Sequence, residues 1–152
     1  MKEFTREEAE SRVGDGYSGE FNEDILDAYD TYSSMDPTEA KDTKIIEATA
    51  KELADMKVKF STGDDHERSW EWVAKMFPDV KVHTCITHDL TAVGFRSPGP
   101  ICSSCQILVD STEQAICIEA LICHELAGGY MRGEIDEDMY AGGPVWVFFE
   151  EE

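Results

Sequence analysis

The sequence predicts an α+β domain: N-terminal helices followed by a small, mostly antiparallel sheet packed on a central apolar helix at about 112–127. Three observations support this prediction. Before Pro78 the apolar residues recur with the helical period, whereas after Pro78 they alternate with the period of two that marks strands. The stretch 112–127 is the most apolar of the chain. At 152 residues the chain has the size of one domain, so we expect a frayed N-terminus over 1–15 and one globular acidic domain over 16–152.

The first predicted helix begins near Ser18 and is amphipathic, with acids covering its solvent side. A second helix is predicted from Pro37 to about Lys57, because Asp36 suits the cap position and proline is favoured at the first helical position. We expect its buried stripe to contain Ile45, Ile46, Thr49, Leu53 and Met56.

A third helix is predicted from Asp65 to Phe77, where Pro78 prevents its continuation. We expect Trp70, Val73, Ala74 and Phe77 to form its buried side.

Strands are predicted after Pro78. The alternation of Val80, Val82, Thr84 and Ile86 with Lys81, His83, Cys85 and Thr87 indicates a strand with two distinct faces. Shorter strands are expected at Thr91–Phe95, at Gln106–Val109 and in the closing "PVWVFF". Between the last two, Ser111 and Gln114 form a helix start signal and paired glycines end the helix at about Ala127.

The net charge of −20, from 33 acids against 13 bases, is the unusual quantity. Such a charge repels nucleic acid and anionic membranes, which argues against direct binding to either. A basic nucleic-acid-binding protein is the complementary partner. The sequence has no apolar run of membrane-spanning length, and its first residues lack the apolar core of a signal peptide. We therefore expect a cytoplasmic protein, in the interior of a host cell.

Two acidic groups are the predicted partner-binding surfaces. On the first helix the carboxylates recur at three- and four-residue intervals, about 5–6 Å apart, which resembles the spacing of phosphates along a nucleic-acid strand. In the second group, a predicted loop, an aromatic side chain accompanies the acids and suits an interface anchor. For both groups there are two alternatives to partner binding: an acidic face that is simply solvated, and adaptation to high salt. The residues are Glu20, Glu23, Asp24, Asp27 and Asp30 in the first group, and Glu134, Asp136, Glu137, Asp138 and Tyr140 in the second.

A cysteine and histidine cluster is the predicted metal site. Cys85, His88, Cys102 and Cys105 follow the spacing C-x2-H-x13-C-x2-C, two short pairs that suit one tetrahedral structural zinc ion. No glycine follows either pair to allow the usual tight turn. Reduced thiols that simply lie in strands are the alternative, and a redox use of "CSSC" fits less well because a strand, not a helix, is predicted after it.

These features favour a non-enzymatic acidic interaction protein. The expected role is that of a viral or mobile-element inhibitor that occupies the basic nucleic-acid-binding groove of a host protein. The alternative is a zinc-stabilised adaptor or a small zinc-containing enzyme that uses the 83–105 cluster. Because the sequence contains no phosphate-binding glycine loop, no nucleophile elbow and no zincin motif, no catalytic residue is predicted.

Overall fold

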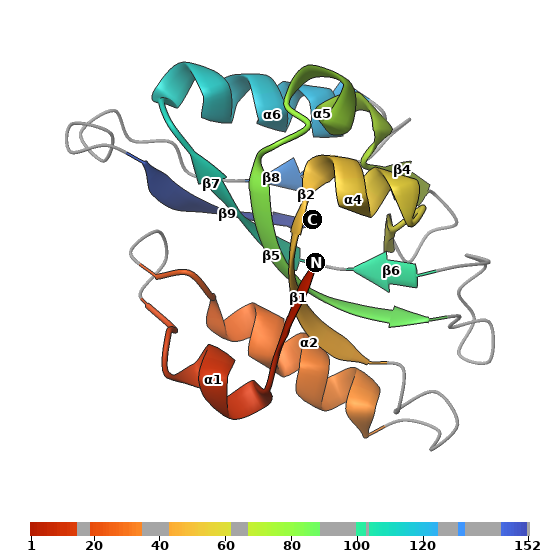
Figure 1. Cartoon of the computed structure of the whole chain (residues 1–152), viewed down its shortest axis with the longest axis vertical. Coiled ribbons are helices and arrows are strands. Elements are labelled where there is room, and N and C mark those ends of the chain that lie inside the picture. The colour runs from red at the N-terminus through yellow and green to blue at the C-terminus, as the bar shows by residue number, and fades with distance from the viewer. Residues whose placement is uncertain are drawn as a thin grey trace.

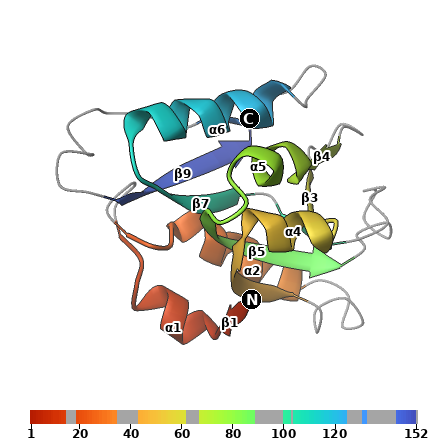
Figure 2. The ribbon, with the colours of Figure 1, turned by 45° about the horizontal axis from the view of Figure 1, so that its top comes forward.

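One sheet lies between two layers of helices in the computed structural model (Figure 1), which confirms the predicted α+β class. Helices α1 (Arg6–Glu10) and α2 (Glu23–Ser33) cover one face. Helices α4 (Ala50–Asp55), α5 (Glu71–Met76) and α6 (Thr112–His124) cover the other, as Figure 2 shows from a second direction. The structure describes residues 1–14, 19–34, 43–61, 67–88, 100–102, 104–124, 131–132 and 144–151.

The sheet of the described residues has nine strands and is antiparallel except at one pair. β5 (Lys81–His88) is central, because the same residues pair with β2 (Lys44–Thr49) on one edge and with β7 (Ser104–Val109) on the other. β1 (Lys2–Phe4) extends the sheet beyond β2, and β9 (Val145–Glu151) extends it beyond β7. The remaining strands are β3 (Lys59–Ser61), β4 (Glu67–Ser69), β6 (Pro100–Cys102) and β8 (Met131–Arg132), with β3 parallel to β6.

Strand β5 is buried on both faces, and its predicted alternation is confirmed. Val82 and Ile86 belong to the apolar core under α4, α5 and α6, whereas Cys85 belongs to the smaller core under α1 and α2. Every residue from 82 to 87 is buried. The strand therefore supplies side chains to two separate cores, and each core holds one helical layer on the sheet.

The helix predicted from Pro37 to about Lys57 was wrong over residues 44–49. Residues 44–49 form strand β2, and only Ala50–Asp55 are helical; 35–42 lie outside the described residues. The β-branched pair Ile45 and Ile46 suits a strand buried on both faces. The helix starts at a second signal, a capping box in which Thr49 and Glu52 each accept a backbone N–H.

The expectation that residues 1–15 fray was also wrong for the described part of that segment. Strand β1 pairs with β2, and the side chain of Phe4 is buried against α1 and α2. Thr5 then caps α1 through a capping box with Glu8. A mainly polar segment is thus held by one strand ladder and by two buried side chains, those of Phe4 and Ala9.

The other predicted elements agree with the structure in part. The helix predicted from near Ser18 starts at Glu23, because Asn22 caps it and Phe21 forms a bridge with Val13. α5 is shorter than the helix predicted from Asp65, because residues 67–69 form strand β4, but Trp70 and Val73 are buried as expected. β7, β9 and α6 lie where the sequence places them. The strand predicted at Thr91–Phe95 and the helical residues 125–127 lie outside the described residues.

Helix α6 offers a matched pair of isoleucines for testing its packing. Ile118 is 0% exposed and Ile116 is 54% exposed. We expect Ile118→Ala to lower the free energy of unfolding by about 2–5 kcal/mol, through lost burial and a residual cavity. Ile116→Ala should change it by less than about 0.5 kcal/mol. Urea unfolding measures both, and equal effects of the two substitutions would contradict the observed orientation of α6.

Candidate functional site

The outer surface of α1 and α2 is the most acidic surface that the described helices form. Thr5 caps α1, and the side chain of Asn22 accepts the Asp24 backbone N–H to cap α2. Apolar residues of both helices are buried against the sheet, so the acids face outward. The exposed acids are Glu7, Glu8, Glu10, Glu23, Asp24, Asp27 and Asp30; we call this set the acidic face.

Arg6 joins α1 to α2, and Arg12 joins the segments next to them. The Arg6 guanidinium binds both carboxylate oxygens of Asp30, at 2.7 and 2.9 Å, and also contacts Glu10 at 3.0 Å. This hydrogen-bonded pairing lowers the pKa of the Asp30 carboxyl. Arg12 contacts Glu20 at 3.3 Å and lies over the ring of Phe4. Two of the five acids predicted on the first helix are therefore used inside the molecule.

The remaining three predicted acids take no part in these ion pairs. Glu23, Asp24 and Asp27 are exposed, and within the described part of the chain they form no ion pair. Glu23 and Asp27 also line a cleft between α1 and α2, together with Arg6, Glu10 and Leu26. The acidic face thus combines unpaired carboxylates with a cleft lined mainly by charged side chains, an arrangement that can accept basic side chains.

A buried histidine fixes the position of α2. His83 on β5 is completely buried between the rings of Phe21 and Trp146, whose centroids lie 4.4 and 4.1 Å from its own. Its Nδ1 lies 3.0 Å from the carbonyl oxygen of Glu20, and its Nε2 lies 2.8 Å from Oε2 of Glu47. The segment that leads into α2 is therefore attached to the central strand of the sheet.

The hydrogen-bond partners define the protonation of this pair. A carbonyl oxygen can only accept, so Nδ1 of His83 carries a proton. The hydrogen bond from His83 lowers the pKa of the Glu47 carboxyl, which favours the carboxylate. Both ring nitrogens of His83 therefore lie within hydrogen-bonding distance of an oxygen atom, one on the backbone and one on the Glu47 carboxylate.

A second contact secures the same segment. The buried Gln106 of β7 donates from Nε2 to the carbonyl oxygen of Gly19 at 2.9 Å. On the other side, the Gly14 backbone N–H donates to the carbonyl oxygen of Phe21 at 3.2 Å. A Cβ at Gly19 would collide with the backbone nitrogen of Gly14, so only glycine fits this passage.

The second predicted acidic group cannot be placed. Glu134, Asp136, Glu137, Asp138 and Tyr140 lie outside the described residues. The partner-binding role of this group stays a prediction from sequence alone.

The predicted zinc ligands are divided between the two faces of the sheet. Thr84 pairs with Cys105, so those two side chains share a face, and Cys85 points to the other. Cys102 and Cys105 accordingly lie in the core under α6, and Cys85 lies in the core under α2. Burial raises the pKa of the thiols of Cys85 and Cys105, as expected for reduced cysteines in an apolar core.

No group of three potential metal ligands occurs among the residues that the structure describes, and this set leaves out the His88 side chain. The zinc site therefore stays a prediction without geometric support.

Sequence reasoning missed two features of this site. The α1 acids Glu7, Glu8 and Glu10 were treated as part of a frayed terminus, although the capping-box pattern from Thr5 to Glu8 signals a helix start. His83 was not among the predicted site residues. Its position on a strand with buried neighbours on both sides was the available signal.

Comparisons of the chain with known protein families, curated proteins and solved structures returned no match. None of the described helices is long and apolar enough to cross a membrane.

The contact between Glu47 and His83 predicts a pH-dependent stability. The folded-state pKa of Glu47 lies below its unfolded value, so its stabilisation is present above about pH 4.3 and is lost as the pH falls through the folded pKa. Glu47→Gln should lower the free energy of unfolding at neutral pH by about 1.5 kcal/mol, the lower end of the range for hydrogen bonds to charged groups. The difference from wild type should shrink in acid, as measured by denaturant unfolding at several pH values. A constant difference down to the folded-state pKa of Glu47 would contradict a hydrogen bond from His83 to the ionised Glu47 carboxylate.

Proposed function

We propose that this chain is a non-enzymatic acidic interaction protein whose α1/α2 face binds the basic nucleic-acid-binding groove of another protein. In this role the carboxylates of the acidic face take the places of phosphates, and the partner cannot bind nucleic acid at the same time. The proposed place of action is the cytoplasm of a host cell. The single observation that carries the proposal is the outward row Glu23, Asp24 and Asp27, which is exposed and unpaired within the described part of the chain.

The charge balance of the face supports a cationic partner. Seven exposed acids lie on α1 and α2, and Arg6 and Arg12 are the only bases between residues 6 and 34. Arg6 is already bound to Asp30 and Glu10, and Arg12 is bound to Glu20. Both arginines are thus engaged with other carboxylates, and Glu23, Asp24 and Asp27 keep their charge for the lysines and arginines of a partner.

The rigidity of the face supports the same role. α2 is anchored by backbone contacts to His83 and Gln106 and is linked to α1 through Arg6. A rigid row of charges loses little conformational entropy on binding, which favours association with a groove shaped for a regular polyanion. The spacing along α2, about 5–6 Å between neighbouring acids, is of the order that such a groove requires.

Charge reversal tests this function. The immobilised wild type should capture proteins from a cell extract, and duplex DNA should elute them. The variant that carries Glu23→Lys, Asp24→Lys and Asp27→Lys should fail to retain these DNA-eluted proteins. Retention by the wild type should also fall steeply between about 50 and 200 mM salt, as for contacts with phosphate-binding sites. Elution by DNA is the informative step, because it selects partners bound through their nucleic-acid site.

A matched control separates the acidic face from net charge. Glu3 on β1, Asp55 on α4 and Glu119 on α6 are acids that belong neither to the acidic face nor to the surroundings of α5, and Glu3 alternates along its strand with Phe4, which faces α1 and α2. Their reversal to lysine changes the net charge equally and should leave retention intact. Equal loss in both variants would show a nonspecific charge effect, and no loss in either would exclude the α1/α2 face.

A further inference from the structure

Helix α5 carries an apolar ridge on its outer side. Trp72 is 45% exposed and Met76 is 55% exposed, although both are large apolar residues. They are four residues apart in the helix and so lie on one side of it, while Val73 on the inner side is buried. The ammonium group of Lys75 lies 5.5 Å from the centroid of the Trp72 ring.

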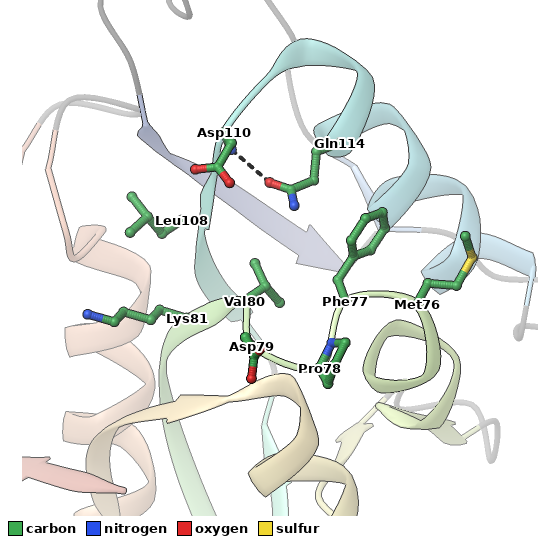
Figure 3. A pocket seen from close by; sticks show the side chains of 9 residues that line it. All are labelled: Met76, Phe77, Pro78, Asp79, Val80, Lys81, Leu108, Asp110 and Gln114. Carbon is green, nitrogen blue, oxygen red and sulfur yellow. Dashed lines mark hydrogen bonds between the residues drawn. The ribbon is translucent and has the colours of Figure 1, made fainter.

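A pocket of about 380 Å³ adjoins this ridge, and Met76 belongs to both. It lies at the end of the sheet where β5 begins and β7 ends (Figure 3). Phe77, Pro78, Val80 and Leu108 provide apolar lining. One side is held by the Asp110 backbone N–H, which donates to Oε1 of Gln114 at 2.7 Å. An apolar side chain of a partner would fit this space.

The surroundings of the ridge and pocket are acidic. The exposed carboxylates of Glu71, Asp79, Asp110 and Glu113 come from α5, from the loop before β5 and from the start of α6. Two lysines are nearby: Lys75 is positioned over Trp72, and Lys81 points away from Phe77 in Figure 3. Apolar surface flanked by acids complements a segment that is both apolar and basic.

We propose that the Trp72–Met76 ridge and its pocket bind a cationic amphipathic segment of another protein. An apolar side chain of that segment enters the pocket, and its lysines or arginines face the flanking acids. Pairing with a second copy of this chain is disfavoured, because each copy carries a net charge of −20. The site goes beyond the proposed function, since α5 packs on the face of the sheet opposite to α1 and α2.

Three synthetic peptides about four helical turns long test the proposal. One is an amphipathic peptide of leucine and lysine, the second replaces leucine with alanine at the same charge, and the third replaces lysine with glutamate. In nitrogen-15 spectra of the full chain, the leucine–lysine peptide should shift the Trp72 indole and the backbone signals of residues 76–81. It should bind at least about ten-fold more tightly than either of the other two peptides, because both apolar and basic groups are required.

Met76→Asp should weaken the leucine–lysine peptide by about ten-fold, as expected for an anchor position. Ile116→Asp is the matched control, since Ile116 has nearly the same exposure but does not line the pocket. The triple reversal on α2 should leave this binding at Trp72 intact, so failure here is distinguishable from failure of the proposed function.

Three results would overturn the proposal. One is equal binding of the alanine–lysine peptide, which would reduce the interaction to charge alone. Another is a set of shifts on α1 and α2 in place of Trp72. The third is a concentration-dependent dimer in sedimentation that Met76→Asp abolishes, which would assign the ridge to a second copy of the chain.

Discussion

A buried imidazole between aromatic rings is the constraint on which one half of this structure depends. Both nitrogens of His83 need polar partners, since an unsatisfied buried polar group costs about 1–3 kcal/mol. The carbonyl oxygen of Glu20 meets one need and Glu47 meets the other. The contact with the Glu20 carbonyl oxygen brings residues 19–21 onto the sheet. Phe21 then stacks on the imidazole, and α2 starts at a defined place. The acidic helices are thus positioned by a polar contact as well as by their apolar sides.

The two helical layers differ in the size of the core that they cover and in the charge that they carry. The layer of α4, α5 and α6 covers the larger core, which contains Trp70 and Phe149 and provides most of the burial that offsets chain entropy. The layer of α1 and α2 covers a smaller core and carries a dense array of like charges. Repulsion within that array is reduced by the paired arginines, and the first-turn acids Glu23 and Asp24 interact favourably with the positive end of the α2 dipole.

Local patterns in the sequence were sufficient to predict those helices and strands whose apolar residues follow one clear period. The alternation in β5 and the capped apolar stretch of α6 are of this kind, and both are confirmed. Residues 44–55 were not predictable from periodicity alone, because Ile45 and Ile46 fit either the buried side of a helix or a strand buried on both faces. At the site, the exposure of Glu23, Asp24 and Asp27 followed from helical spacing, but the use of Glu20 and Asp30 in ion pairs depended on where α1 packs. That packing depends on strand pairing by β1, which joins residues 2–4 to residues 45–47, more than forty positions away.

The anchoring of residues 19–21 through main-chain carbonyls has a consequence for how the acidic face can change. Contacts to the carbonyl oxygens of Gly19 and Glu20 recognise the path of the backbone and do not depend on which outward side chains α2 presents. Substitutions along the exposed side of α2 can therefore accumulate without loosening the helix from the sheet. Such an arrangement separates the requirements of folding from those of recognition, and it would let a lineage follow a changing partner surface by altering charges one at a time while its scaffold stays constant.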